Sequence, residues 1–168
     1  MENTDALRGE KILVLGCPGS GKSTFSVKLR EITGVPLIHL DNVWWNPDRT
    51  HVSREEFDLR LAAILAGERW ILDGDYSRTY ETRIAACDTV IFLDFPEAEC
   101  MAGIQERVGK TRPDIPWTEQ TLDPELAAQV QRYRAENRPA LLSLFSKYPE
   151  KQTIVFCSRA EADAWLAR

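Results

Sequence analysis

The sequence lacks any apolar run approaching the ~20 residues that a membrane-spanning helix needs, so no membrane partner is expected. Its first residues, Met1-Glu-Asn-Thr-Asp5, are acidic and lack the basic start of a signal peptide. Internal repeats, low-complexity tracts and linkers are also missing from the 168 residues. These absences predict a single domain over residues 1–168, in a cytoplasmic protein.

Paired cysteines are missing as well. Cys17, Cys87, Cys100 and Cys157 are widely separated and form no C-x-x-C pair, which excludes a zinc or disulfide framework and indicates reduced thiols. There is no basic excess, because 21 basic residues face 26 acidic ones and the net charge is −5. This charge makes direct nucleic-acid binding an unfavoured interpretation.

Short apolar runs alternate with longer amphipathic segments along the chain. Ile12–Leu15 is a continuous apolar run, as expected of a central parallel strand with both faces buried. Four further runs share this character: 36–40, 70–72, 89–93 and 153–156. Five strands separated by helices predict an α/β fold of three layers, in which helices cover both faces of a parallel sheet.

Capping residues mark where helices should begin. Ser53 and Ser158 each precede a glutamate by three residues, which is the pattern of a capping box. Asp123 followed by Pro124 opens a helix that we expect to run to about Lys147. The irregular stretch 109–122, with two prolines and an isolated tryptophan, interrupts the alternation and is expected to form a lid over a site.

One segment fits a specific motif. Gly16-Cys-Pro-Gly-Ser-Gly-Lys-Ser23 matches G-x-x-x-x-G-K-[ST], follows a predicted strand and opens a predicted helix. Backbone N–H groups of such a loop cradle phosphate oxygens, while Lys22 would contact the β- and γ-phosphates and the Ser23 hydroxyl would bind Mg²⁺. The expected nucleotide-binding residues are Gly16, Cys17, Pro18, Gly19, Ser20, Gly21, Lys22, Ser23 and Thr24. The motif predicts ATP and Mg²⁺ as cofactors without identifying a phosphoryl acceptor.

Three aspartates directly follow predicted strands. Asp41, Asp73 and Asp94 should therefore lie at the carboxyl edge of the sheet, where ligands bind in such folds. Asp73 and Asp94 are candidates to bind Mg²⁺ together with Ser23, because Mg²⁺ prefers oxygen ligands. Capping of a helix or turn is the commoner role of a single strand-end aspartate, and stays open for each of them.

Trp44 and Trp45 are adjacent indoles in a polar stretch, so both cannot face one core. Packing in the core, a hinge for the lid, and a wall for a ring-shaped acceptor are the open interpretations. His39 and His51 are interpreted as structural or surface residues.

Six segments together resemble a known group: GCPGSGKST, PLIHLDNVWWNP, WILDGDYSRT, TVIFLDFP, RVGKTRPD and ENRPALL. They run in this order over nearly the whole chain. The sequence resembles small P-loop kinases of the adenylate-kinase-like group and, more closely, the bacterial proteins labelled DNA topology modulation proteins. The resemblance implies a P-loop NTPase fold with a short lid, and ATP-dependent phosphoryl transfer to a small-molecule or nucleotide acceptor.

The resemblance also implies roles for individual residues. An acidic residue at the place of Asp41 orients or deprotonates the acceptor hydroxyl in such kinases. Asp73-Gly-Asp-Tyr-Ser-Arg-Thr79 is similar to the DGFPRT segment of adenylate kinases, although one extra residue separates Gly74 from Arg78. The acceptor-binding residues implied in this way are Asp41, Trp44, Trp45, Asp75 and Arg78.

On the lid side, Arg107 takes the place of an adenylate-kinase lid arginine that stacks on adenine, and Arg112 or Lys110 would approach the phosphates. The loop after the last strand, Cys157-Ser158-Arg159, should border the base largely through backbone groups, with Ser158 among the nucleotide-binding residues. The predicted catalytic residues are Lys22, Asp41, Arg107 and Arg112.

Two alternatives come from other functional classes. The chain could be a nucleotide-binding regulatory ATPase linked to DNA topology, without a small-molecule acceptor. A GTPase-type switch is disfavoured, because the sequence has no N-K-x-D guanine motif after a strand.

Overall fold

In the computed structural model, which describes residues 6–168, the predicted strands form one parallel sheet. The acidic segment 1–5 lies outside the described residues. The sheet order is β2-β3-β1-β4-β5, and β1 lies between β3 and β4, with Val14 beside Asp73 and Gly16 beside Leu93. The strands are β1 (Lys11–Gly16), β2 (Leu37–His39), β3 (Trp70–Asp73), β4 (Thr89–Leu93) and β5 (Gln152–Phe156).

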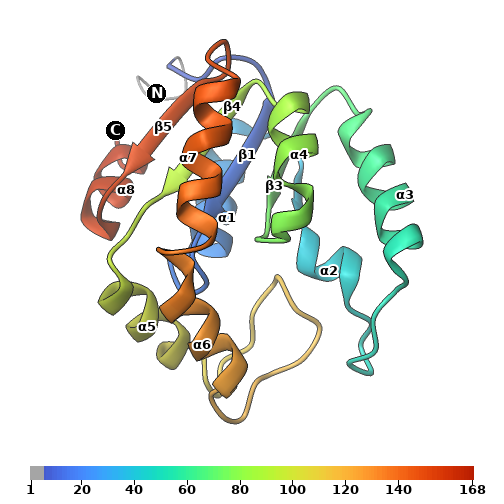
Figure 1. Cartoon of the computed structure of the whole chain (residues 1–168), viewed down its shortest axis with the longest axis vertical. Coiled ribbons are helices and arrows are strands. Elements are labelled where there is room, and N and C mark those ends of the chain that lie inside the picture. Colours follow the sequence, from blue (N-terminus) through green and yellow to red (C-terminus); the bar gives the residue numbers. More distant parts are fainter. Residues whose placement is uncertain (1–5) are drawn as a thin grey trace.

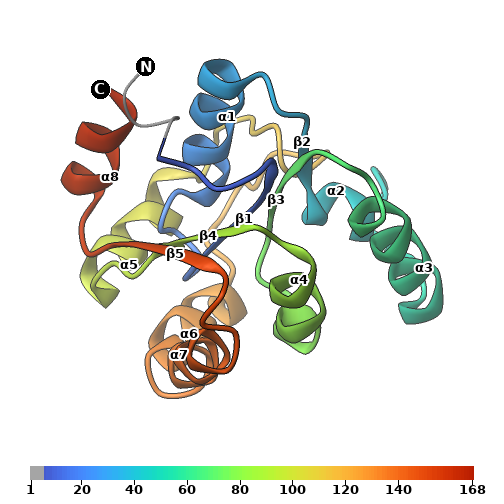
Figure 2. The same ribbon diagram turned by 90° about the horizontal axis from the view of Figure 1, so that it is seen from above.

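Helices cover both faces of this sheet, which confirms the three-layer prediction. Seen from above, α1 (Lys22–Thr33) and α8 (Arg159–Leu166) lie on one face, while α4 (Tyr80–Ala86) and α7 (Asn137–Lys147) lie on the other (Figure 2). The remaining helices are α2 (Leu40–Trp44), α3 (Arg54–Leu65), the 3-10 turn η1 (Ser77–Thr79), α5 (Glu97–Glu106) and α6 (Pro124–Tyr133). Figure 1 places α2, α5 and α6 at the carboxyl ends of the strands, where the sequence predicts the site.

The core follows the apolar runs of the sequence. Ile12–Leu15 of β1 is at most 1% exposed, because neighbouring strands flank it and helices cover both sides. Phe57, Leu61 and Leu65 face inward from α3, as their helical spacing predicts. Within residues 6–168, no helix has both the length and the apolar character to cross a bilayer.

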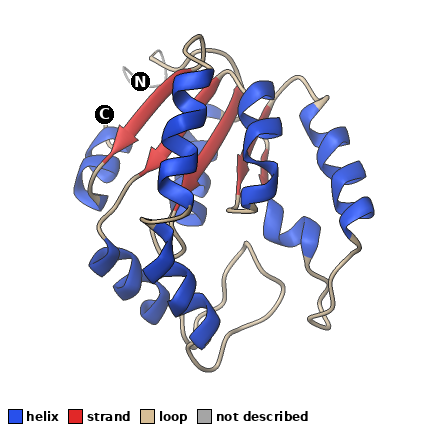
Figure 3. Cartoon of the chain, in the orientation of Figure 1, coloured by secondary structure: helices blue, strands red, loops and turns tan. Residues whose placement is uncertain are grey.

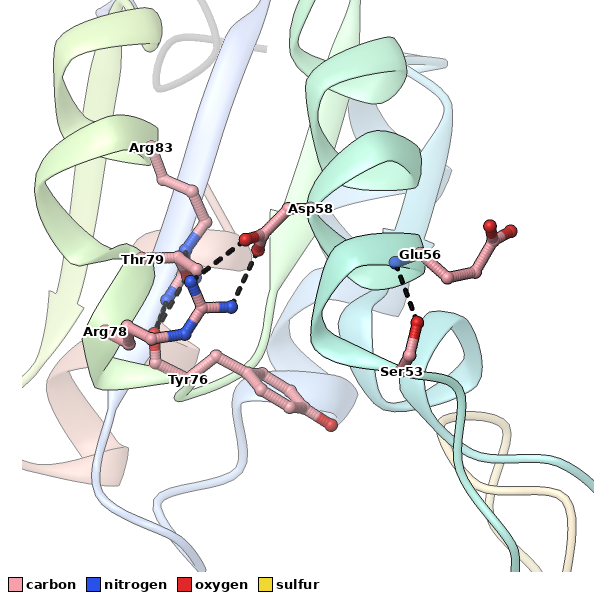
Figure 4. A network of polar contacts seen from close by, with 7 residues as sticks. All are labelled: Ser53, Glu56, Asp58, Tyr76, Arg78, Thr79 and Arg83. Carbon is pink, nitrogen blue, oxygen red and sulfur yellow. Dashed lines mark hydrogen bonds and ion pairs between the residues drawn. The ribbon is translucent and has the colours of Figure 1, made fainter.

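The predicted helix starts are confirmed by their caps. Ser53 accepts a hydrogen bond from the Glu56 N–H at 3.1 Å (Figure 4), and Ser158 accepts one from the Glu161 N–H at 3.2 Å. Asp123 accepts one from the Glu125 N–H at 2.9 Å. Each cap satisfies a backbone donor that has no partner within its helix.

The single helix predicted from Asp123 to about Lys147 is wrong. The structure divides it into α6, which ends at Tyr133, and α7, which begins at Asn137. The cause is Pro139, which has no N–H to donate to the carbonyl of Ala135 and whose ring would clash with that carbonyl in a continuous helix. Breaking the helix one turn earlier places Pro139 in the first turn of α7, where a missing donor costs nothing.

Between α5 and α6 the chain runs from residue 107 to 123 without helix or strand (Figure 3). This segment, here called the lid, contains the predicted excursion 109–122. It crosses below the carboxyl ends of the strands and extends toward α2 (Figure 1).

Candidate functional site

A cleft of about 1230 Å³ lies at the carboxyl ends of the strands. Its walls come from the loop between β1 and α1, α2 with the turn after it, the loop after β3, the lid and α6. A typical pocket for one small ligand measures about 300–1,000 Å³, so the cleft has room for two ligands side by side. The cleft also lies where the strand order of the sheet reverses. From β1 the chain passes to β2 and β3 on one side, and then to β4 and β5 on the other side of β1, and ligands bind at such points in parallel sheets.

The glycine-rich loop carries the backbone conformations that its motif requires. Gly19 and Gly21 have φ of +83° and +88°, values that side chains with a Cβ rarely adopt. Gly21 is the last residue before α1, whose first N–H groups and dipole therefore face the cleft. The loop also packs on α5, because a Cβ at Gly19 would lie 1.9 Å from the carbonyl oxygen of Cys100.

The predicted nucleotide-binding residues divide into two sets. Gly16, Cys17 and Ser20 are buried beneath the loop and do not line the cleft. The residues that line it are Pro18, Gly19, Gly21, Lys22, Ser23 and Thr24. Lys22 Nζ donates to the carbonyl oxygens of Gly16 at 2.8 Å and Cys17 at 3.1 Å. These two bonds leave the third ammonium donor available.

Two of the strand-end aspartates have different surroundings. Asp73 lines the cleft, and both of its oxygens lie 2.9 Å from Nδ1 of the buried His39. Burial opposes protonation of His39, but the hydrogen bond and negative charge of Asp73 outweigh it, so the pKa of His39 is raised. Asp94 does not line the cleft: its carboxylate accepts three hydrogen bonds from Arg138 of α7, at 2.8, 3.0 and 2.8 Å.

The third aspartate, Asp41, lies in the first turn of α2 and lines the cleft. Tyr76 Oη donates a hydrogen bond to its Oδ1 at 2.7 Å. Burial is the main cause that raises the pKa of Asp41, and the charges of Asp114 and Asp73 act in the same direction against the hydrogen bond from Tyr76. A carboxylate with a raised pKa binds a proton more readily, which is the property of a general base.

Sequence reasoning missed Tyr76 and Arg83, which shape the loop after β3. Tyr76 has a left-handed backbone with φ of 42°, and its carbonyl oxygen accepts from Thr79 N at 2.8 Å. Arg83 is fully buried, and donates to the carbonyl oxygens of Gly74 at 2.9 Å, Asp75 and Tyr76 at 3.3 Å. Burial lowers the pKa of Arg83 to about 10. The only signal in the sequence was an arginine on the apolar face of a short helix.

Aromatic rings line the cleft beside Asp41. The ring of Trp44 stacks on that of His51, with 4.4 Å between ring centroids, and its centroid lies 6.2 Å from that of Tyr76. Trp45 meets Trp117 of the lid edge to face, with 5.3 Å between ring centroids. Both indoles line the cleft, while Trp44 also packs edge to face on the core residue Phe57.

The two remaining residues expected on the acceptor side are placed differently. Asp75 lines the cleft and accepts a hydrogen bond from Tyr80 Oη. Arg78 does not line it, because its guanidinium turns outward to Asp58 of α3, with bonds of 2.6 and 3.1 Å (Figure 4). The structure therefore does not bring Arg78 together with the other candidates.

The lid brings its basic residues to the cleft. Arg107, Lys110 and Arg112 all line it, and Arg112 Nε lies 3.4 Å from Oδ1 of the buried Asp114. Burial is the main cause that lowers the pKa of Arg107, and the charge of Arg112 acts in the same direction. The lid is held to α2 by Asn42 Nδ2, which donates to the carbonyl oxygen of Pro113 at 2.7 Å.

After β5, the residue that reaches the cleft is not Ser158, which was expected to bind nucleotide, but the next residue, Arg159. Ser158 caps α8 and does not line the cleft, whereas Arg159 does. Arg159 Nη2 lies 3.4 Å from the carbonyl oxygen of Gly19, and its guanidinium stands over Gly21. The loop 157–159 was expected to border the base, and the residue that it brings to the cleft is Arg159, its last.

No family model matches the sequence, and no curated protein matches it. Among solved structures, the chain is similar to shikimate kinase from Bacteroides thetaiotaomicron, with 16% sequence identity, coverage of 94% of each chain and a TM-score of 0.55. At this identity the likeness is one of fold. The chain shares the P-loop fold of that structure. The predicted fold class is therefore confirmed, and the roles of single residues remain to be argued from the geometry.

Proposed function

We propose that this protein transfers the γ-phosphoryl group of ATP to a hydroxyl group of a small molecule. The observation that carries this proposal is that one cleft is lined both by the glycine-rich loop with Lys22 and by Asp41, a carboxylate beside an aromatic wall. A site for ATP hydrolysis alone would need no such wall.

ATP would lie along residues 16–24 of the glycine-rich loop. Backbone N–H groups at the start of α1 and the Lys22 ammonium would hold its phosphates, and Arg159 would add positive charge from the β5 side. We assign the base of ATP to the side of the cleft near β4 and β5, with Arg107 of the lid against it. That assignment leaves the side near β2 and β3 to the acceptor.

The donors in the cleft fit a magnesium ion. Ser23 and Asp73 offer a hydroxyl and a carboxylate in the cleft, where the Asp73 oxygens also contact His39 Nδ1. Asp94 lies outside the cleft lining and is bound by Arg138. Mg²⁺ bound beside phosphates takes only one or two protein ligands, and the oxygens of Ser23 and Asp73 would be enough. When bound, Mg²⁺ would neutralise charge on the β- and γ-phosphates.

The proposed reaction uses the chain's own groups as follows. Asp41 accepts the proton of the acceptor hydroxyl, while the acceptor oxygen forms a bond to the γ-phosphorus. The bond from that phosphorus to the β–γ bridging oxygen breaks, and ADP keeps its electron pair. Lys22, Arg107 and Arg112 balance the negative charge around the transferred group, and the lid excludes water.

The comparison supports a small acceptor, because the similar structure is named as a kinase of shikimate, a small molecule. The resemblance to DNA topology modulation proteins stays a prediction from the sequence.

Radiolabelled ATP, Mg²⁺ and pooled small hydroxyl compounds provide the test. We expect label to move from ATP to one class of compound with the wild-type protein, and transfer to fall by 10²–10⁴ with Asp41→Asn. ATP consumption without any labelled product, at a rate that no compound changes, would contradict the proposal and favour a regulatory ATPase.

A further inference from the structure

The acceptor half of the cleft has a continuous aromatic wall. Trp44, Trp45 and Trp117 all line it and come from α2, the residue after α2 and the lid. Tyr76 adds a fourth ring, 6.2 Å from Trp44. Flat indole surfaces of this kind pack against the face of a ring and gain little from a bare phosphate or a short chain.

The polar groups of the same half are mainly negative. Asp41 and Asp75 both line the cleft, and each accepts a hydrogen bond from a tyrosine hydroxyl. Two such bonds fix the carboxylates without neutralising them. An anionic group on the acceptor would be repelled by both charges in a partly buried setting, where screening by solvent is weak.

Two arginines that could offset these charges, Arg78 in the turn after β3 and Arg83 in α4, are bound elsewhere. Arg78 is paired with Asp58 on the outer surface (Figure 4), where its Nη1 and Nη2 each donate a hydrogen bond to the carboxylate. Arg83 is fully buried and donates to backbone carbonyls of residues 74–76. Neither side chain lines the cleft, so the segment 73–79 offers no cation to an acceptor phosphate.

Arg49 is the cation that the turn after α2 contributes. It is exposed, lines the cleft, and lies with its guanidinium carbon 5.6 Å from the centroid of Trp117. This cation–π contact holds the Arg49 guanidinium against the Trp117 ring while the guanidinium stays largely hydrated. The lid adds Arg112, which lies 3.4 Å from the carboxylate of Asp114, while Arg107 is assigned to ATP. Arg49 and Arg112 therefore face the three carboxylates of Asp41, Asp75 and Asp114, and this half of the cleft has no positive excess.

We infer that the acceptor is a ring-bearing alcohol that carries no negative charge, held by its ring face against Trp45 and Trp117 and by its hydroxyl at Asp41. Nucleosides, neutral sugars and amino sugars share this chemistry, whereas nucleoside monophosphates, sugar phosphates and carboxylic acids do not. This inference rests on the proposed kinase function.

Matched pairs of compounds test the charge. The protein is saturated with Mg²⁺ and a non-hydrolysable ATP analogue, and its affinities for adenosine and AMP, glucose and glucose 6-phosphate, and glucosamine and glucosamine 6-phosphate are measured by calorimetry. The uncharged or cationic member of at least one pair should bind tenfold more tightly than its partner. At one hundred times its Kd it should raise the melting temperature by about 5–10 °C. The pair that responds tells nucleoside from sugar.

Tryptophan variants test the wall. Trp45→Ala and Trp117→Ala should weaken binding of the responding compound tenfold or more, with the affinity for the ATP analogue changed less than threefold. Trp165→Phe is the matched control, because Trp165 of α8 packs on Phe25 and Phe156 and does not line the cleft. Trp165→Phe should keep the fluorescence change that the compound causes, and Trp45→Phe and Trp117→Phe should each reduce it.

The outcomes separate the two proposals. Failure of the ATP analogue to bind would overturn the proposed function and the acceptor with it. Binding of the analogue together with a preference for the anionic member of the pairs, lost in Arg49→Ala, would overturn the acceptor class alone. The acceptor class is likewise overturned if the analogue binds and no uncharged ring compound does.

Discussion

Gly103 of α5 touches the backbone of Gly19 in the glycine-rich loop: a Cβ at Gly103 would lie 2.0 Å from the carbonyl oxygen of Gly19. The contact is reciprocal, because a Cβ at Gly19 would meet the carbonyl of Cys100 on the same helix. The shape of the loop therefore depends on a helix that follows β4, far along the sequence, and lies beside the lid.

Gly103→Ala should deform the loop. Alanine favours a helix by about 1 kcal/mol over glycine, but the clash is with backbone and outweighs that gain, so we expect a net loss of about 1–3 kcal/mol. The affinity for an ATP analogue should fall at least tenfold. Ala102→Gly, at an exposed place on the same helix, is the control: calorimetry should find its nucleotide affinity unchanged. Equal affinity in both variants would show that the loop tolerates the contact.

Lys22→Ala should fold and lose affinity for nucleotide. The side chain is half-buried and bonds only to two carbonyls of its own loop, so its removal opens no core cavity. Loss of a charged hydrogen-bond donor to phosphate costs about 1.5–3 kcal/mol, or roughly ten- to hundredfold in Kd. Lys28→Ala, which breaks an exposed pair with Asp163, should bind the analogue as wild type does. A Lys22 variant that still transfers phosphoryl groups at the wild-type rate would refute the assignment of the loop.

Asp41→Asn should stabilise the protein at neutral pH. The raised pKa of Asp41 means that the folded state binds its proton more tightly than the unfolded state. Stability is therefore greatest below the ordinary pKa of about 4, and falls as pH rises through the folded-state pKa. Removing the charge should abolish that fall, and each 1 kcal/mol gained raises the melting temperature by about 2–4 °C.

The matched control for this titration is Asp58→Asn. The hydrogen bond from Arg78 is the first cause that lowers the pKa of Asp58, so its contribution has the opposite sign and is lost as the pH falls. Melting curves from pH 3 to 8 compare the two variants. A lower melting temperature of Asp41→Asn at pH 7, with turnover per folded molecule unchanged, would assign Asp41 a purely structural role in the turn into α2.

Residues 109–122 should become more protected from hydrogen exchange when Mg²⁺ and an ATP analogue bind. Closure would bring Arg107 and Arg112 over the phosphates and exclude water. Amides of α7, which pack on the opposite side of the sheet from α1, serve as the internal reference. Equal exchange of the lid with and without nucleotide would indicate a static loop.

The fold could be predicted from the sequence because its signals are local. Apolar runs such as Ile12–Leu15 give the strands, and caps such as Ser53 and Asp123 give the helix starts. The break between α6 and α7 was missed, although its cause, Pro139, is also local. Pro139 interrupts the helix one turn before its own position, at residues 134–136, and no glycine or proline marks that place in the sequence.

The site could be predicted only in part, because its contacts join residues distant in sequence. The aspartates at strand ends look alike in the sequence, yet Asp41 and Asp73 line the cleft while Asp94 is covered by Arg138 from a later helix. Similarly, the spacing of Arg78 could not show that Asp58 of α3 would draw it outward. The lid is also fixed by apolar contacts, since Ile115 is buried and Trp117 packs against Trp45.

The attachment of the lid to α2 has a kinetic consequence. The hydrogen bond from Asn42 to Pro113 and the contact of Trp45 with Trp117 both close the side of the cleft assigned to the acceptor. We expect these contacts to separate when a ring compound enters toward Asp41, and again when the phosphorylated product leaves. Because opening moves a whole segment through solvent, the turnover rate should decrease as viscosity increases, even where the chemical step is unaffected.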